Sequence, residues 1–257
     1  MTGGRAALSW IVAPLAAVSL LLGGPAQAAQ ITADTLDALP PHDVVILGEV
    51  HDNPWHHENQ AAAVVAIQPA ALVFEMLTEE QAARVTPDLM TRPVALGEAL
   101  GWAESGWPDF GMYAPIFAAA PDARVVGAAV PRAALRGVVA GEDAMPEDAA
   151  RWRLDRPLPT AQQAEREAMQ ARAHCDALPE EMLPGMVRAQ RVRDAAIARA
   201  TREAVAATGG PVAVITGNGH ARTDWGVPHK LGHAAPEVSV LSIGQLESTP
   251  EGVPPYD

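Results

Sequence analysis

One segment is the starting point for predicting the fold, namely Val44-Val45-Ile46-Leu47-Gly48-Glu49-Val50-His51. Its first four residues are apolar, and three of them are β-branched. A short apolar run without polar residues at alternate positions is typical of a buried strand in a parallel sheet. Polar residues follow directly, so that Glu49 and His51 come where the strand ends. Because ligands bind at the carboxyl ends of parallel strands, we expect a helix-covered sheet with a polar site at that edge.

Similar apolar runs recur along the chain and indicate the other strands of this sheet. The expected strands are residues 71–74, 125–128 and 212–215, with a weaker one at 238–241. The helices expected between them are residues 54–67, 79–85 and 113–119. Asn53 is suited to cap the first helix, and Pro54 to its first position. Alternating strands and helices predict an α/β fold with a mainly parallel β-sheet flanked by helices.

The stretch between the third and fourth apolar runs differs in composition. It contains no convincing strand and is rich in Ala, Arg, Glu, Gln and Met. Two long helices are expected in it, at about 161–173 and 184–207. We predict a smaller all-helical insert subdomain that leans on the edge of the sheet. The predicted units are 29–130 and 210–247 for the sheet domain, 131–209 for the insert, and 248–257 for a proline-rich tail that frays.

Composition narrows the class of protein. The 257 residues are 49% hydrophobic, which allows a sizeable core and excludes global disorder. The formal net charge of −13 leaves no uniform basic surface for phosphate backbones, so we expect no nucleic-acid partner. The one cysteine, Cys175, excludes an internal disulfide and any CxxC metal or redox pair.

Residues 1–28 have the pattern of a secretory signal peptide. Arg5 is their only charged residue, an apolar run follows over 6–22, and Ala26-Gln27-Ala28 offers a cleavage site. The alternative is a membrane anchor, since the apolar run is nearly long enough to span a bilayer. Pro25 and the small residues before the cut favour cleavage. The expected product is periplasmic or secreted and has no stable membrane anchor.

Ionisable side chains follow three of the expected strands. Glu49 and His51 follow the first strand, Glu75 the second, and His220 the fourth. Because parallel strands share one carboxyl edge, these two carboxylates and two imidazoles should meet there. A buried carboxylate needs a cation, a proton or several hydrogen-bond donors. The cluster suits a divalent metal such as zinc or manganese, or an acid/base pair with tuned pKa values.

The same residues could instead have purely structural roles. Either glutamate could pair with an arginine such as Arg222, and His51 could be a loop histidine bonded to Asp52. His56 and His57 lie at the expected start of a helix and could simply be solvated there. Adjacent residues on a helix point in different directions, so we expect at most one of them to face the site.

Residues 101–115 gather aromatic side chains in a chain that is 4% aromatic. They include Trp102, Trp107, Phe110 and Tyr113. Such a segment either forms a lid over a flat apolar ligand or fills the edge of a core. A phenolate oxygen and an imidazole are both legitimate haem-iron ligands, which makes Tyr113 a candidate.

The second expected helix of the insert places several residues near one face. They are Met186, Gln190, Asp194 and Ile197. Polar groups within an apolar stripe indicate a face turned either to a site or to the boundary with solvent. The pair His174-Cys175 is interpreted as structural, because adjacent residues rarely ligate the same metal.

Five motifs occur in a characteristic order along the chain. They are GEVHDNPWHH at 48–57, FEM at 74–76, SGWPDF at 105–110, AQRVRDAAIA at 189–198 and TGNGHARTDWGVP at 216–228. Together they resemble the ChaN-like haem-binding uptake family, within the Tiki/TraB/erythromycin-esterase-like superfamily, over about residues 33–245. The resemblance implies a sheet domain with a smaller helical domain. It also implies a bacterial protein of iron acquisition whose haem pocket two subunits can share.

The resemblance implies a haem site and suggests candidates for it. Haem ligation in the family through tyrosine and histidine points to Tyr113 and to the loop of His51, His56 and His57. Members that are lipoproteins have a lipid-anchor cysteine after the signal, and this chain has none there. The implied form is therefore soluble and periplasmic.

The first function that we predict is an exported haem-binding protein for iron or haem uptake. Its partners would be haem, a second copy sharing the haem pocket, and haem transport proteins of the outer membrane or periplasm. Arg222 and Lys230 would offer cations to the propionates of haem. The cofactor-binding residues expected here are His51, His56, Trp107, Tyr113, His220 and Arg222.

The alternative function is a metal-dependent or acid/base hydrolase acting on an ester or peptide. The superfamily uses two Gly-x-x-His motifs and glutamates for such a centre. In this chain, His51, His220 and Glu75 would hold the metal, and Glu49 would act as the base that activates water. No Gly-x-Ser-x-Gly motif is present, and the substrate cannot be read from the sequence.

Overall fold

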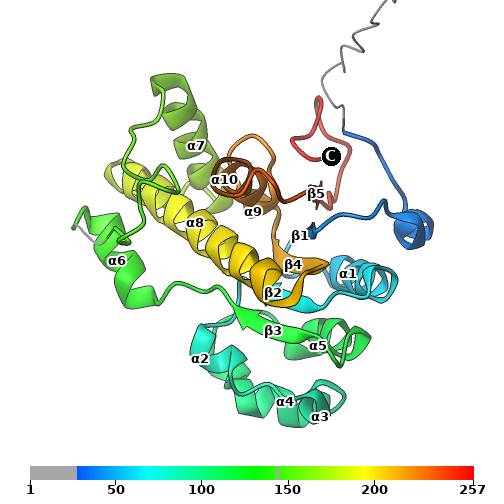
Figure 1. Ribbon diagram of the computed structural model, residues 1–257. Helices are drawn as coiled ribbons and strands as arrows, with labels where there is room; N and C mark the ends of the chain where they lie inside the picture. Colours follow the sequence, from blue (N-terminus) through cyan, green and yellow to red (C-terminus); the bar gives the residue numbers. More distant parts are fainter. Residues whose placement is uncertain (1–27, 143–144) are drawn as a thin grey trace, which may run out of the picture.

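A five-stranded parallel sheet forms the centre of the protein in the computed structural model, which describes residues 28–142 and 145–257 (Figure 1). The predicted signal peptide therefore lies outside the described residues, apart from its last residue. The strand order is β3-β2-β4-β1-β5. The strands are β1 (Val44–Glu49), β2 (Ala71–Phe74), β3 (Arg124–Gly127), β4 (Val212–Gly217) and β5 (Val240–Ile243). The expected α/β fold with a parallel sheet is confirmed.

Helices cover both faces of this sheet, which explains why its strands lack a polar face. On one face, Val45 and Leu47 of β1 pack with α1, α4 and α5; on the other, Val44 and Ile46 pack with α6, α8 and α10. These helices are α1 (Pro54–Ile67), α4 (Pro93–Leu100), α5 (Phe110–Ala119), α6 (Arg132–Ala140), α8 (Leu183–Thr208) and α10 (Val227–Ala234). The remaining short elements are η1 (Ala33–Ala38), α2 (Glu79–Ala82), α3 (Pro87–Met90), η2 (Trp102–Glu104), η3 (Glu180–Met182) and α9 (Asn218–Ala221). None of the helices in the described ranges is long and apolar enough to cross a membrane.

Local capping signals set the helix starts. α1 occupies the predicted residues, and the Asn53 side chain accepts a hydrogen bond from the Trp55 N–H at 3.0 Å. α5 begins three residues before its predicted start, because Asp109 caps it by accepting from the Gly111 N–H at 2.6 Å. α2 is shorter than predicted, since the residue before Pro87 is extended and a new helix begins there.

The helical insert shares a core with the sheet. Its helices α7 (Thr160–Ala173) and α8 extend one residue beyond the predicted ends at most, and α8 crosses one face of the sheet rather than leaning on its edge (Figure 1). Val192 and Ile197 of α8 belong to the same cluster of buried side chains as Val73 of β2 and Val214 of β4. Packing on the sheet therefore determines where the polar residues of α8 lie.

The C-terminal residues pack against the sheet, so the predicted fraying of the tail is wrong. The Asp257 N–H donates to the Ser242 carbonyl at 3.0 Å, and the Ser242 N–H donates to the Asp257 side chain at 2.8 Å. The Thr223 N–H donates to the Pro255 carbonyl at 2.8 Å. These bonds give the outer edge of β5 a partner.

A glycine allows α8 to approach α6 closely. A Cβ atom at Gly185 would lie 2.3 Å from the main-chain oxygen of Val139. Backbone atoms of a packed helix cannot move aside easily, so any side chain at this position would force the two helices apart. By contrast, a Cβ atom at Gly232 of α10 would meet nothing within 4 Å.

We expect Gly185→Ala to lower the free energy of unfolding by about 1–3 kcal/mol, because the added methyl overpacks the α6–α8 contact. The matched substitution Gly232→Ala should raise it by up to about 1 kcal/mol, because alanine has the higher helix propensity. Urea unfolding of both variants followed by circular dichroism measures the difference. Equal stabilities for the two variants would contradict the close contact at Gly185.

Candidate functional site

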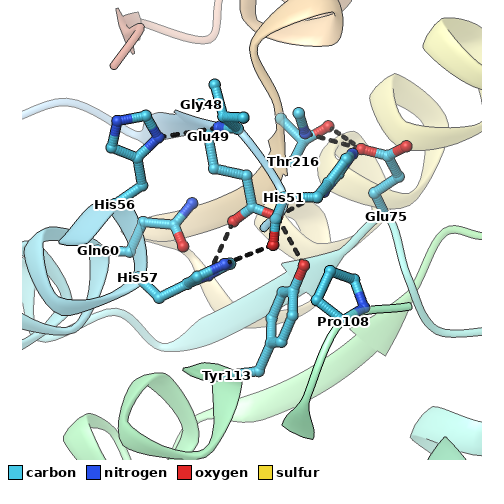
Figure 2. A network of polar contacts seen from close by, with 12 residues as sticks. Gly48, Glu49, His51, His56, His57, Gln60, Glu75, Pro108, Tyr113 and Thr216 are labelled. Carbon is cyan, nitrogen blue, oxygen red and sulfur yellow. Dashed lines mark hydrogen bonds and ion pairs between the residues drawn. The ribbon is translucent and has the colours of Figure 1, made fainter. Parts of the chain in front are cut away.

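The structure brings the four ionisable residues of the strand ends to one edge of the sheet, and Figure 2 shows three of them, Glu49, His51 and Glu75. The register of β1 and β4 places Glu49 beside Gly217, and Glu75 directly follows β2. His51 lies in the turn after β1, and His220 lies on α9 directly after β4. Glu49, Glu75, His51 and His220 all line a cleft of about 1250 Å³.

Glu49 is a buried carboxylate with two hydrogen-bond donors and a second imidazole close by. The residue is 2% exposed, and its Oε1 accepts from the Tyr113 hydroxyl at 2.9 Å and from His51 Nδ1 at 2.7 Å. Its Oε2 lies 3.3 Å from Nδ1 of His57. Burial opposes ionisation, but the contacts with the two imidazoles outweigh it and lower the pKa of Glu49. The carboxylate is therefore ionised at neutral pH.

His57 links α1 to this carboxylate. Its Nε2 donates to the main-chain oxygen of His51 at 2.9 Å, while its Nδ1 faces Glu49. Because both ring nitrogens face acceptors, the protonated ring is favoured. Burial works against protonation, yet the carboxylate raises the pKa of His57. Of the two adjacent histidines, the one that faces Glu49 is thus His57, whereas the cofactor-binding residues expected from the sequence included His56.

His51 keeps one ring nitrogen free at the cleft. Its Nδ1 donates to Glu49, which leaves Nε2 without a hydrogen-bond partner among the described residues, and 32% of the side chain is exposed. The ring packs against Trp107 at a centroid distance of 4.8 Å. A Cβ atom at Gly217 would lie 2.8 Å from Nε2, so the absence of a side chain there gives the imidazole its place.

A second network joins Glu75 to α8. Glu75 Oε2 accepts from the Thr216 hydroxyl at 2.7 Å and from the Gly217 N–H at 2.8 Å, and Oε1 lies 3.3 Å from His220 Nε2. His220 Nδ1 donates to Asp194 of α8 at 2.6 Å. Burial opposes protonation of the imidazole, but the two carboxylates outweigh it and raise the pKa of His220 to about 10.

These contacts occupy the atoms that a metal would need. Both ring nitrogens of His220 face carboxylates, and Glu75 Oε2 accepts two hydrogen bonds. Within residues 28–142 and 145–257, no group of three or more His, Cys, Asp or Glu side chains is arranged to hold a metal ion. The predicted zinc or manganese site of His51, His220 and Glu75 therefore does not fit the geometry.

The opposite wall of the cleft comes from the helical insert. Its apolar lining includes Leu135, Val139, Met169, Met182, Met186 and Val187. Arginines line the same cleft, namely Arg132, Arg136, Arg166 and Arg193. His174, at the end of α7, is a further lining residue that the sequence analysis left as structural. Its Nδ1 donates to the Gln170 carbonyl at 2.8 Å, and its Nε2 has no hydrogen-bond partner in the part of the chain that the structure describes.

The aromatic segment fills a core instead of covering the cleft. Tyr113 is fully buried, does not line the cleft, and directs its hydroxyl at Glu49. Burial and that carboxylate raise the pKa of Tyr113 far above its ordinary value, which opposes a phenolate. Trp102 is 4% exposed and packs against Tyr113 and Phe110 at centroid distances of 4.8 and 5.1 Å. Trp107 reaches the site through its contact with His51.

Three other predicted ligand-binding residues do not line this cleft either. His56 Nδ1 accepts from the Val50 N–H at 2.9 Å and so holds the turn after β1. Arg222 donates two hydrogen bonds to Asp224 at 2.9 and 2.6 Å. The ammonium group of Lys230 is buried and donates to a main-chain carbonyl at 2.7 Å.

We expect Glu49→Gln to lower the free energy of unfolding at pH 7 by roughly 3 kcal/mol or more, because it removes the charge that both buried imidazoles face. The exposed Glu98 of α4 offers a control with the same substitution, for which a change within about 0.5 kcal/mol is expected. Denaturant unfolding measures both. If the two variants are equally stable, the Glu49 network does not stabilise the fold.

Comparison with known proteins identifies relatives of this chain. Residues 35–231 match the family model described as haem-binding uptake, Tiki superfamily, ChaN. A solved structure described as cofacial heme binding to ChaN of Campylobacter jejuni is similar with a TM-score of 0.68 and 17% identity. The similarity covers 87% of this chain and 89% of that one, and at this identity it shows a shared fold.

A second solved structure, the type III effector HopBA1, is 15% identical over 69% of this chain and 67% of its own, with a TM-score of 0.37. None of the curated proteins matches the chain. The family match spans most of the sequence and includes every motif that carried the resemblance. The chain therefore belongs to the ChaN family of haem-binding uptake proteins in the Tiki superfamily.

Proposed function

We propose that this protein binds haem in the cleft at the carboxyl edge of the sheet and serves bacterial iron or haem uptake. The observation that supports this most directly is the cleft itself, which combines an apolar wall with free imidazole nitrogens. Its volume of about 1250 Å³ is sufficient for a large ligand, since small-ligand pockets measure roughly 300–1,000 Å³. Membership of the ChaN family points to the same ligand.

The residues that line the cleft fit haem chemically. Haem is a flat apolar disc, and Leu135, Met169 and Met186 offer it apolar contact. A bound haem brings an iron that takes an axial ligand, and the free Nε2 atoms of His51 and His174 are nitrogen donors of the right kind. Tyr113 would first have to lose its hydrogen bond to Glu49 and leave the core. We therefore favour His51 or His174 as the axial ligand.

A hemin titration of the protein beginning at Ala29, followed by absorbance, tests this proposal. We expect a saturable shift of the Soret band, weakened in His51→Ala or His174→Ala and retained in Tyr113→Phe. His42 precedes β1 at the opposite edge of the sheet, so His42→Ala is the matched control and should bind like the unaltered protein. A folded protein without any saturable shift would refute haem binding.

An acid/base hydrolase is a second candidate, favoured by the contact between His51 and Glu49. A carboxylate that orients an imidazole, with the second ring nitrogen free at a cleft, is the arrangement of a general base. The described residues that line the cleft include no Ser, Thr or Cys, so the base would act on water. The metal-dependent form of this hypothesis does not fit the geometry described above.

Glu75→Gln separates the two functions. It keeps the shape of the side chain but removes the charge beside His220. If hydrolysis depends on the Glu75–His220 pair, we expect the variant to lose cleavage of an activated ester such as p-nitrophenyl acetate, whereas hydrolysis by His51 and Glu49 alone should persist. Hemin affinity should stay within about threefold, a change of less than 1 kcal/mol. A folded variant that has lost hemin binding would show that the two functions cannot be separated at Glu75.

We further propose that the protein is exported by a cleaved signal peptide and acts in the periplasm or outside the cell. The support is the charge and hydropathy pattern of residues 1–28, most of which lie outside the described residues. A homodimer that shares the haem pocket, and haem transport partners in the outer membrane or periplasm, belong to the same proposal. Their support is family membership.

A further inference from the structure

Arg166 of α7 is a buried cation at the cleft whose guanidinium lacks a polar partner. The residue is 7% exposed and lines the cleft, and its Nε is buried. Among the described residues, no hydrogen bond or ion pair reaches this guanidinium. It lies over the ring of Trp225, with 4.8 Å between its carbon and the ring centroid. Buried charges are ordinarily paired, so this exception needs an explanation.

The cations around Arg166 already have partners. Arg222 lies on the same Trp225 ring at 3.7 Å, yet it also donates two hydrogen bonds to Asp224. Arg191 donates to two main-chain carbonyls at 2.6 and 2.8 Å, and Lys230 donates to one at 2.7 Å. The missing partner is thus a specific feature of Arg166 and not a general property of this region.

Two acids near Arg166 favour its charge, but among the described residues neither is bonded to it. Oδ1 of Asp194 is bonded to His220 and Asp224 is bonded to Arg222, while Arg191 adds a like charge. Burial, together with that like charge, lowers the pKa of Arg166 to about 10 although Asp194 opposes the shift. The guanidinium is still positive at neutral pH. A buried positive charge that faces a cleft attracts an anion.

We propose that Arg166 is a carboxylate-binding subsite of the cleft and receives a propionate of the bound haem. This inference rests on the proposed function. The guanidinium lies over Trp225 and its Nε is buried, but its terminal nitrogens are not, so their N–H groups are available for a contact with a carboxylate in the cleft. Met169 lies three residues further along α7, on the same face, and lines the cleft as well. One helix face thus offers an apolar contact and a cation to a single amphipathic ligand.

Arg172 of α7 offers a matched control. It lies on the same helix as Arg166, but its side chain is exposed and does not line the cleft, so solvent and salt screen its charge. If any positive charge near the cleft attracted the ligand, Arg166 and Arg172 would be equivalent. If Arg166 binds the carboxylate directly, its substitution alone should weaken binding of a ligand with free carboxylates more than binding of a ligand without them.

The experiment titrates hemin and hemin dimethyl ester, whose carboxylates are blocked, into three forms of the full chain. These are the unaltered protein, Arg166→Met, which keeps an apolar stem over Trp225, and Arg172→Met. We expect Arg166→Met to weaken hemin binding about 10- to 100-fold, as for a lost charge-assisted hydrogen bond. The affinity of the ester should change less than about threefold in the same variant, and Arg172→Met should change hemin affinity by less than that.

Other outcomes overturn the inference in distinguishable ways. If Arg166→Met weakens the binding of hemin and of its ester equally, Arg166 does not recognise the carboxylate. The same conclusion follows if the two variants lose equal affinity for hemin. An unaltered protein that binds both porphyrins equally well would leave haem binding intact and refute the subsite. Binding of neither porphyrin would refute the proposed function itself. Should Arg166→Met fail to fold by circular dichroism, Arg166→Lys replaces it and should weaken hemin but not the ester.

Discussion

The ionised carboxylate of Glu49 is the constraint on which the arrangement of this edge of the sheet depends. It lies at the end of β1 and is almost completely buried, so it is stable only if donors surround it. Those donors come from the following turn, from α1 and from α5, through His51, His57 and Tyr113. The charge thereby ties two helices to the strand on which it lies. It also orients His51 so that one ring nitrogen is free at the cleft.

The second carboxylate couples the sheet to the helical insert. Glu75 is held by the end of β4, and His220 connects it to Asp194 of α8. Because α8 also packs on the sheet through its apolar side chains, polar and apolar contacts place the insert in the same position. The result is a cleft with a polar rim on the sheet and an apolar wall on the insert. This division suits an amphipathic ligand, and the strand-end carboxylates are paired with protein groups.

Around this cleft, polar side chains that have hydrogen-bond partners within the protein differ from Arg166, which has none among the described residues. His56, Arg222 and Lys230 each have a partner within the protein, so their polarity is accounted for by the fold. Arg166 is as deeply buried as His56 and Lys230 but has no such partner among the described residues. An unpaired buried charge is unfavourable for folding, and such strain tends to be retained where a ligand relieves it. Whether a polar side chain lacks a hydrogen-bond partner in the protein is therefore a better indication of a ligand-binding role than its distance from the cleft.

The order of apolar runs and polar residues was enough to predict the parallel sheet and the residues at its edge. Apolar runs without alternation can be buried only between two layers of helices, and the residue after each run must lie at the common edge. Glu49, His51, Glu75 and His220 follow from that rule alone. The tertiary structure decided their partners, because the donors and the cleft wall come from α1, α5, α7 and α8, which are distant in sequence. No local pattern encodes how such segments meet, so the pairing of His57 with Glu49 and the exposure of Arg166 to the cleft emerged only from long-range packing.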